Sequence, residues 1–120
     1  VEDNAVNRML AQRMLLSLGF ESDAAEDGEK GLEAHRREPY DVIFMDVQMP
    51  GMDGLEATRR IRENEHSSMK RLPIIAMTAH AMDGVVERCL AAGMDQCATK
   101  PIEPDKVAAL LKTFLKGAAV

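Results

Sequence analysis

The stretch of residues 41–54, Asp-Val-Ile-Phe-Met-Asp-Val-Gln-Met-Pro-Gly-Met-Asp-Gly, constrains the fold most strongly. Its unbroken apolar run at 42–45 is typical of a strand buried on both faces of a parallel sheet. The strand ends just past Asp46, because Pro50 cannot donate a ladder hydrogen bond and Gly51 tolerates positive φ. Ligands bind at the carboxyl ends of strands in open α/β sheets, which makes Asp46 a candidate site residue. A loop aspartate that caps the next helix is the alternative.

Helical and strand-like patterns alternate along the rest of the chain. Apolar residues at helical spacing, with capping residues and glycine or proline stops, predict helices over 5–18, 27–38, 54–62, 82–92 and 104–116. Short apolar runs predict strands over 20–25, 41–45, 73–77 and 96–99, and residues 1–3 resemble the end of a strand whose beginning is missing. This alternation predicts a three-layer α/β fold in which five helices cover both faces of a five-stranded parallel sheet.

The size and composition describe one globular domain covering residues 1–120. Hydrophobic residues make up 46% and charged residues 29%, which excludes a disordered chain. No apolar run approaches the roughly 18 residues that span a bilayer, and no signal-peptide pattern opens the chain, so we expect a cytoplasmic domain without membrane insertion. The net charge of -5 argues against direct nucleic-acid binding.

Three further patterns receive ordinary structural interpretations. The basic residues within 59–71 are interleaved with glutamates, which predicts a solvated helix face and loop. Cys89 and Cys97 match neither a CxxC motif nor a zinc spacing, and we therefore expect reduced thiols. Nine methionines and few aromatic residues predict a methionine-rich aliphatic core.

Polar side chains follow the predicted strands at the point where each strand ends. They are Glu2 and Asp3, Asp46, Thr78 and Lys100. Because the carboxyl ends of parallel strands share one edge of a sheet, we expect these side chains to gather there. Clustered carboxylates repel one another, and a hard divalent cation such as Mg²⁺ (or Mn²⁺) relieves that repulsion. A lysine beside them is a natural counter-charge for a phosphoryl group, while a set of loop acids and helix caps is the alternative.

Five motifs, in this order, resemble those of the receiver domains of two-component response regulators. They are Glu2-Asp3-Asn4, Phe44-Met45-Asp46, Met49-Pro50-Gly51-Met52-Asp53-Gly54, Thr78-Ala79 and Lys100-Pro101. The resemblance covers essentially the whole chain and implies a flavodoxin-like fold with strand order 2-1-3-4-5, whose central first strand is N-terminally truncated here. Asn7 and the stretch Thr78-Ala79-His80-Ala81 most resemble receivers attached to hybrid sensor histidine kinases.

The resemblance also implies a role for each candidate site residue. Asp46 would be the phosphoacceptor in a Mg²⁺-dependent transfer from phosphohistidine, followed by slow autodephosphorylation. Asp3 and Asp46 would bind the metal directly, Glu2 through water, and the backbone carbonyl of Gln48 would complete the protein ligands. Thr78 and Lys100 would contact the phosphoryl oxygens.

Positions around the site would set the lifetime of the phosphorylated state and its readout. Gln48, Ala79 and His80 would tune hydrolysis, although a solvent-facing loop histidine is the alternative for His80. The Lys100-Pro101 peptide is expected to be cis. Thr78 and Cys97 occupy the switch positions, and receivers commonly carry Tyr or Phe where Cys97 stands. We therefore predict that phosphorylation occurs without an aromatic switch. Cys97 is expected to be a small strand residue rather than a redox sensor.

The partners implied are a histidine kinase or a histidine phosphotransfer domain. They would dock on the face formed by the fourth helix, fifth strand and fifth helix, and the same face could form a homodimer. The domain could be the cytosolic part of a membrane-bound hybrid kinase. The alternative function is an aspartyl-phosphate hydrolase of the haloacid dehalogenase type, which needs an acid where Gln48 stands. A flavodoxin would need a Ser/Thr-Gly phosphate loop after the first strand, which this sequence lacks. An EF-hand would need metal ligands where Pro50 and Ala57 stand. A pure binding module would be expected to tolerate the loss of Lys100.

Overall fold

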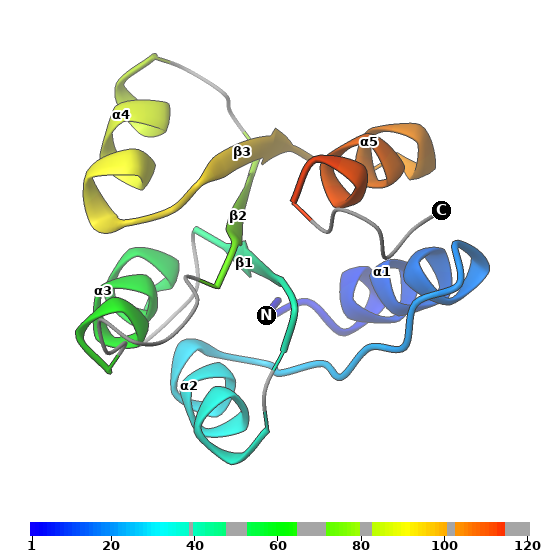
Figure 1. Ribbon diagram of the computed structural model, residues 1–120, viewed down its shortest axis with the longest axis horizontal. Helices are drawn as coiled ribbons and strands as arrows, with labels where there is room; N and C mark the ends of the chain where they lie inside the picture. The colour runs from blue at the N-terminus through cyan, green and yellow to red at the C-terminus, as the bar shows by residue number, and fades with distance from the viewer. Residues whose placement is uncertain (39, 48–52, 65–71, 80–82, 101–102, 115–120) are drawn as a thin grey trace.

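The computed structural model describes residues 1–38, 40–47, 53–64, 72–79, 83–100 and 103–114, and the structural statements below concern this part of the chain. From α2 onward, helices and strands alternate as predicted (Figure 1). The elements are α1 (Ala5–Ser17), α2 (Gly28–Arg37), β1 (Ile43–Asp46), α3 (Gly54–Asn64), β2 (Ile74–Thr78), α4 (Asp83–Ala92), β3 (Gln96–Thr99) and α5 (Pro104–Phe114).

The three strands form one parallel sheet in the order β1-β2-β3. Ile43 pairs with Ile74 at the start of β1, and Ile75 pairs with Gln96 at the start of β3, so all three strands end at one edge. Helices α1 and α5 lie on one side of the sheet, whereas α2, α3 and α4 lie on the other (Figure 1). The predicted three-layer α/β architecture is therefore confirmed.

The core is centred on β2, all of whose residues are buried. Ile74 and Ile75 are completely inaccessible to solvent, and burying each side chain contributes on the order of 2 kcal/mol. The buried methionines Met45, Met77 and Met94 confirm the prediction of a methionine-rich aliphatic core. β1 and β2 thus behave as the doubly covered strands that their apolar runs predict.

The segment at 20–25 is not a strand, contrary to the prediction, and the described sheet has three strands rather than five. Val1 and Glu2 lie between this segment and β1 and form backbone hydrogen bonds with both. The Glu2 N–H donates to the Ala25 carbonyl (3.0 Å), and the Asp46 N–H donates to the Val1 carbonyl (2.9 Å). Beside them, a cavity of about 810 Å³ lies between residues 20–25, α1 and the start of β1. In the described structure one backbone hydrogen bond joins residues 20–25 to residues 1–3, which is too few to make a strand pair.

Helix α1 forms where predicted but contributes no buried residue. Val6 is 59% exposed and Leu10 is 51% exposed, although both recur at helical spacing. The inner side of the helix, including Ala11 and Leu15, lines the cavity rather than a packed sheet. The pattern therefore predicts the helix correctly.

Arg62 is largely buried, contrary to the prediction that the basic residues within 59–71 lie on a solvated helix face and loop. Its side chain is only 12% exposed and donates to the carbonyl oxygens of Gly93 (2.8 Å) and Leu72 (2.7 Å). It also forms an ion pair with Asp95 (2.7 Å), whose carboxylate accepts a hydrogen bond from the Ile74 N–H (2.9 Å). Arg62 thereby ties α3 to the turn between α4 and β3.

Arg59 and Arg60 do match that prediction, whereas Lys70 and Arg71 lie outside the described residues. Arg59 and Arg60 are exposed and pair with Glu56 on the same helix.

Within the described part of the chain, no helix has the length and apolar character needed to cross a membrane.

Candidate functional site

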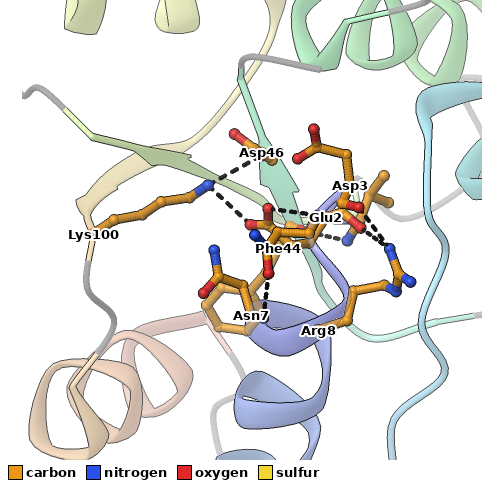
Figure 2. Close-up of polar contacts among 9 residues, drawn as sticks. Glu2, Asp3, Asn7, Arg8, Phe44, Asp46 and Lys100 are labelled. Carbon is orange, nitrogen blue, oxygen red and sulfur yellow. Dashed lines mark hydrogen bonds and ion pairs between the residues drawn. The ribbon is translucent and has the colours of Figure 1, made fainter. Parts of the chain in front are cut away.

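Three carboxylates meet at the edge where the strands end. One oxygen from each of Glu2, Asp3 and Asp46 lies within 4.8 Å of the other two. Glu2 and Asp46 are 5% and 2% exposed, whereas Asp3 faces solvent (Figure 2). The gathering of these acids, which the sequence predicts from the ends of separate strands, is thus present in the structure.

Lys100 approaches this acidic cluster from the end of β3. Its Nζ atom lies 2.9 Å from Glu2 Oε2 and 3.0 Å from Asp46 Oδ2 (Figure 2). Burial lowers the pKa of Lys100, but its hydrogen bonds to the two carboxylates outweigh this effect and raise the pKa overall. The ammonium group therefore stays charged at neutral pH and bridges both buried acids.

Glu2 is also held in its charged form. Burial raises the pKa of Glu2, whereas hydrogen bonds from the Lys100 ammonium and the Asn4 N–H (3.2 Å) lower it by more. The net effect is a pKa below the usual range for glutamate. A buried but ionised carboxylate is thus available beside Asp46.

The position of Asp46 is set by the backbone around the end of β1. The Val47 N–H donates to the Met77 carbonyl (3.0 Å), which keeps β1 paired with β2 just past the acid. Gly54, the first residue of α3, lies against the Asp46 carbonyl oxygen, and a Cβ atom there would also come within 2.9 Å of Met45 Cγ. Glycine is therefore needed at this close approach, which explains the glycine that ends the 41–54 stretch.

Arg8 is a site residue that the sequence reasoning misses. From the first turns of α1, its Nη1 atom donates to the backbone carbonyls of Glu2 (2.8 Å) and Asp3 (3.0 Å), as Figure 2 shows. The Asn4 side chain accepts a hydrogen bond from the Asn7 N–H (3.0 Å) and so caps the same helix, as predicted. The signal in the sequence is weak, because a basic residue five positions after an acid is common on helices.

The remaining predicted residues occupy the same edge or lie outside the described part. Thr78 is the last residue of β2 and is 4% exposed, and its carbonyl accepts a hydrogen bond from the Lys100 N–H (2.7 Å). Ala79 is exposed, and Cys97 is half-buried on β3. Gln48, His80 and Pro101 lie outside the described residues, so the carbonyl ligand, the tuning roles and the cis peptide predicted there remain predictions.

The donor set of this edge fits a hard divalent cation. Glu2, Asp3 and Asp46 offer only oxygen ligands, and the single ammonium of Lys100 contacts two of these three carboxylates. Mg²⁺ prefers such carboxylate oxygens and retains several waters, which suits a cluster with one solvent-facing acid. A cation here, together with Lys100, could also neutralise an incoming phosphoryl group.

Comparisons with known proteins agree with this arrangement. Residues 1–112 match the family of the response regulator receiver domain. The chain is 42% identical over 131 residues to probable histidine kinase 2 of Oryza sativa subsp. indica, covering 98% of this chain and 12% of that protein. It is 42% identical over 117 residues to hybrid signal transduction histidine kinase I of Dictyostelium discoideum, covering 93% of this chain and 7% of that protein. The chain thus spans a small part of these relatives.

A solved structure shares both the fold and much of the sequence. It is the receiver domain of a sensor histidine kinase from Pseudomonas aeruginosa PAO1, determined with a magnesium ion coordinated in its active-site cleft. The two chains superpose with a TM-score of 0.86 at 40% identity, over 96% of this chain and 93% of that one.

Proposed function

The chain belongs to the response regulator receiver domain family, and from this we propose that Asp46 accepts a phosphoryl group from a phosphohistidine. The observation that carries the proposal is the buried Asp46 carboxylate, 3.0 Å from the Lys100 ammonium and beside two further acids. The family match favours this function over the haloacid dehalogenase alternative, which also lacks its second acid at Gln48.

The proposed step is an in-line displacement at phosphorus. An Asp46 carboxylate oxygen attacks the phosphorus atom, and the bond from phosphorus to the histidine nitrogen breaks. The nitrogen keeps the electron pair, and the product is an acyl phosphate on Asp46. Water later attacks the same phosphorus and releases inorganic phosphate, and we expect this hydrolysis to be slow because Asp46 is only 2% exposed.

Lys100 and Thr78 would stabilise the transferred group. The Lys100 ammonium, now shared between Glu2 and Asp46, would pair with phosphoryl oxygens once the Asp46 charge is consumed. Thr78 ends the strand beside β1, and its hydroxyl would hydrogen-bond the same oxygens. Both residues carry out positioning and charge neutralisation, which is most of the catalytic work in phosphoryl transfer.

The metal in this proposal is Mg²⁺, with Mn²⁺ as a substitute. Asp3 and Asp46 would bind it directly and Glu2 through water, which agrees with the 4.8 Å spacing of their oxygens. The Gln48 carbonyl is the remaining proposed ligand. When bound, the ion would offset the negative charge that the phosphoryl group brings to this acidic edge. The magnesium ion in the similar Pseudomonas aeruginosa receiver supports the choice of metal.

The proposed partners are a histidine kinase or a histidine phosphotransfer domain. The relatives are histidine kinases that are several times longer than this chain, which supports a receiver within a hybrid kinase. We propose a cytosolic location, in keeping with the two free cysteines, and a partner face formed by α4, β3 and α5. The β2–β3 pairing next to Thr78 and Lys100 supports that face, which could also serve a homodimer.

The experiment is phosphorylation by radiolabelled acetyl phosphate in the presence of Mg²⁺. We expect wild-type protein and the Asp41→Asn control to incorporate label, and Asp46→Asn to incorporate none; Asp41 is an exposed acid before the start of β1. The label should be lost with hydroxylamine, which cleaves acyl phosphates. Label retained by Asp46→Asn, or steady release of phosphate from simple phosphate esters, would contradict the proposal.

A further inference from the structure

The cavity of about 810 Å³ lies between two non-helical stretches of the chain, residues 20–25 and residues 40–44. Residues 1–2 fill one end of the gap between these stretches, and the cavity continues the gap from there. Earlier in both stretches, the Tyr40 hydroxyl donates to Asp23 Oδ2 (2.7 Å), and both residues line the cavity. The two walls are therefore tied together at two places.

The gap is one strand wide where the first residues of the chain occupy it. The Glu2 N–H donates to the Ala25 carbonyl on one side (3.0 Å), and the Val1 nitrogen donates to the Phe44 carbonyl on the other (2.6 Å). The Asp46 N–H also donates to the Val1 carbonyl (2.9 Å), so Val1 bonds to two alternate residues of β1. This is the hydrogen-bond pattern of a parallel pair. The cavity thus continues the position of a strand parallel to β1.

The edge of β1 that borders the cavity can pair with such a strand. The N–H groups of Ile43 and Val47 donate toward β2, and alternate residues of a strand direct their backbone groups to the opposite edge. By this alternation the Phe44 N–H and the Val42 carbonyl face the cavity, which both residues line. The edge along the cavity, residues 41–44, matches an inserted strand of about four residues at roughly 3.3 Å each.

Both faces of an inserted strand would meet apolar parts of helices on opposite sides of the sheet (Figure 1). Ala11 and Leu15 of α1 line the cavity, as do Gly31 and Ala34 of α2. A Cβ atom at Gly31 would lie 2.6 Å from Val1 Cγ2, so α2 lies directly against this path of the chain. Strands covered by helices on both faces are apolar throughout and enriched in β-branched residues.

We propose that this cavity is a binding site for an extended apolar peptide segment of another chain, which adds as a strand parallel to β1. The segment has about four residues, is rich in valine and isoleucine, and pairs with β1 on one edge and with residues 20–25 on the other. The cavity volume falls within the roughly 300–1,000 Å³ of ordinary ligand sites, and the ties between the walls preform it. The inference goes beyond the proposed phosphoryl transfer and does not depend on it.

The test titrates the folded chain with the peptide acetyl-Lys-Val-Ile-Val-Val-amide, whose lysine supplies solubility. We expect saturable binding of one peptide per chain in calorimetry, and slower amide hydrogen exchange in α1 and in residues 40–46. A peptide with proline in place of isoleucine should bind at least about tenfold more weakly, because proline removes an N–H that would bond to one of the two walls.

Variants of α1 test the location of the site. Ala11→Trp and Leu15→Trp each place a large ring in the cavity and should weaken peptide binding at least about tenfold. Arg13→Trp, on the exposed side of the same helix, is the matched control and should bind the peptide like the wild type. The two cavity variants guard against loss of the fold in either one, and circular dichroism identifies the folded variant.

Several outcomes would overturn the proposal. They are the absence of saturable binding, equal binding of the proline peptide, unchanged binding by a folded cavity variant, and slowed exchange confined to α4 and α5. Dimerisation of the chain that the peptide does not reverse would assign the cavity to a second copy and would also overturn it. If neither cavity variant folds, the comparison of the two peptides and the exchange pattern still decide.

Discussion

Lys100 and Glu2 show how single side chains keep charge buried at the sheet edge. Glu2 is ionised despite burial because an ammonium group 2.9 Å away compensates its charge. The lysine is in turn kept charged by the two carboxylates, so each group holds the other in its ionised state. Such buried ion pairs affect the free energy of unfolding mainly when they are broken, since removal of one partner leaves an uncompensated buried charge.

The lowered pKa of Glu2 makes stability depend on acid pH. A carboxylate whose pKa is depressed in the folded state stabilises it above the unfolded pKa, and that stability is lost as pH falls through the folded value. We expect the urea midpoint of the wild type to fall below pH 4.5, the ordinary pKa of glutamate, more steeply than that of Glu2→Gln. The exposed Glu21→Gln is the matched control. Identical pH profiles for wild type and Glu2→Gln would contradict the role given to Glu2.

Arg8 holds the backbone that carries two of the acids, so its loss should weaken cation binding without removing a ligand. We expect Arg8→Met to bind Mg²⁺ about tenfold more weakly in calorimetric titration, as is typical when a residue that orients metal ligands is lost. Arg13→Met, on the exposed side of the same helix, should bind Mg²⁺ like the wild type. Equal affinities in all three proteins would show that Arg8 does not orient the acids.

At the scale of elements, Arg62 links α3 to the turn that leads to β3 through polar contacts, which together form the Arg62 clamp. Its guanidinium group reaches two backbone carbonyls and one carboxylate, and both members of the ion pair are largely buried. The clamp sets the path of the chain into β3, and β3 ends next to Lys100. The acidic site therefore depends on an interaction on the far side of the sheet from α1.

Removal of this clamp should be costly. We expect Arg62→Ala to lower the free energy of unfolding by about 3 kcal/mol, because Asp95 loses its buried counter-charge and two carbonyls lose a donor. Arg60→Ala breaks an exposed pair with Glu56 and should cost less than about 1 kcal/mol. Urea denaturation of both variants measures the difference, and similar losses would contradict a clamp function for Arg62.

At the scale of the whole molecule, the two sides of the sheet are unequally packed. α2, α3 and α4 cover one face closely, and this side contains the buried core cluster. On the other side, α1 has no buried residue and borders a cavity of about 810 Å³. The acidic site lies at the edge of the sheet between these two sides, with Glu2 and Asp3 before the start of α1 and Asp46 and Lys100 at the ends of β1 and β3.

The absence of buried residues in α1 and the full burial of β2 predict unequal local stability. We expect amide hydrogens of α1 to exchange faster than those of β2, since local opening is easiest where few apolar contacts are broken. Hydrogen exchange followed by mass spectrometry of peptides from the two elements measures this directly. Equal protection of α1 and β2 would mean that the chain opens only as one cooperative unit.

The sequence predicts the helices, the three central strands and the gathering of the acids, because apolar runs and strand ends are local features. It wrongly predicts a strand at 20–25, because a strand forms only when a neighbouring strand pairs with it and residue identity alone does not show that pairing. The interactions of Arg62 also escape prediction, since they depend on which face of α3 meets a distant turn. Arg8 escapes because its partners are backbone carbonyls, which leave no trace in residue identity.

The most direct test of the central claim is to locate the acyl phosphate by reduction with borohydride, which converts a phosphorylated aspartate to homoserine. After reaction with acetyl phosphate and Mg²⁺, mass spectrometry of the digested protein should find homoserine at position 46 and nowhere else. Homoserine at Asp3 or Asp53 instead, or none in a protein that has incorporated label, would contradict the assignment of Asp46 as the phosphoacceptor.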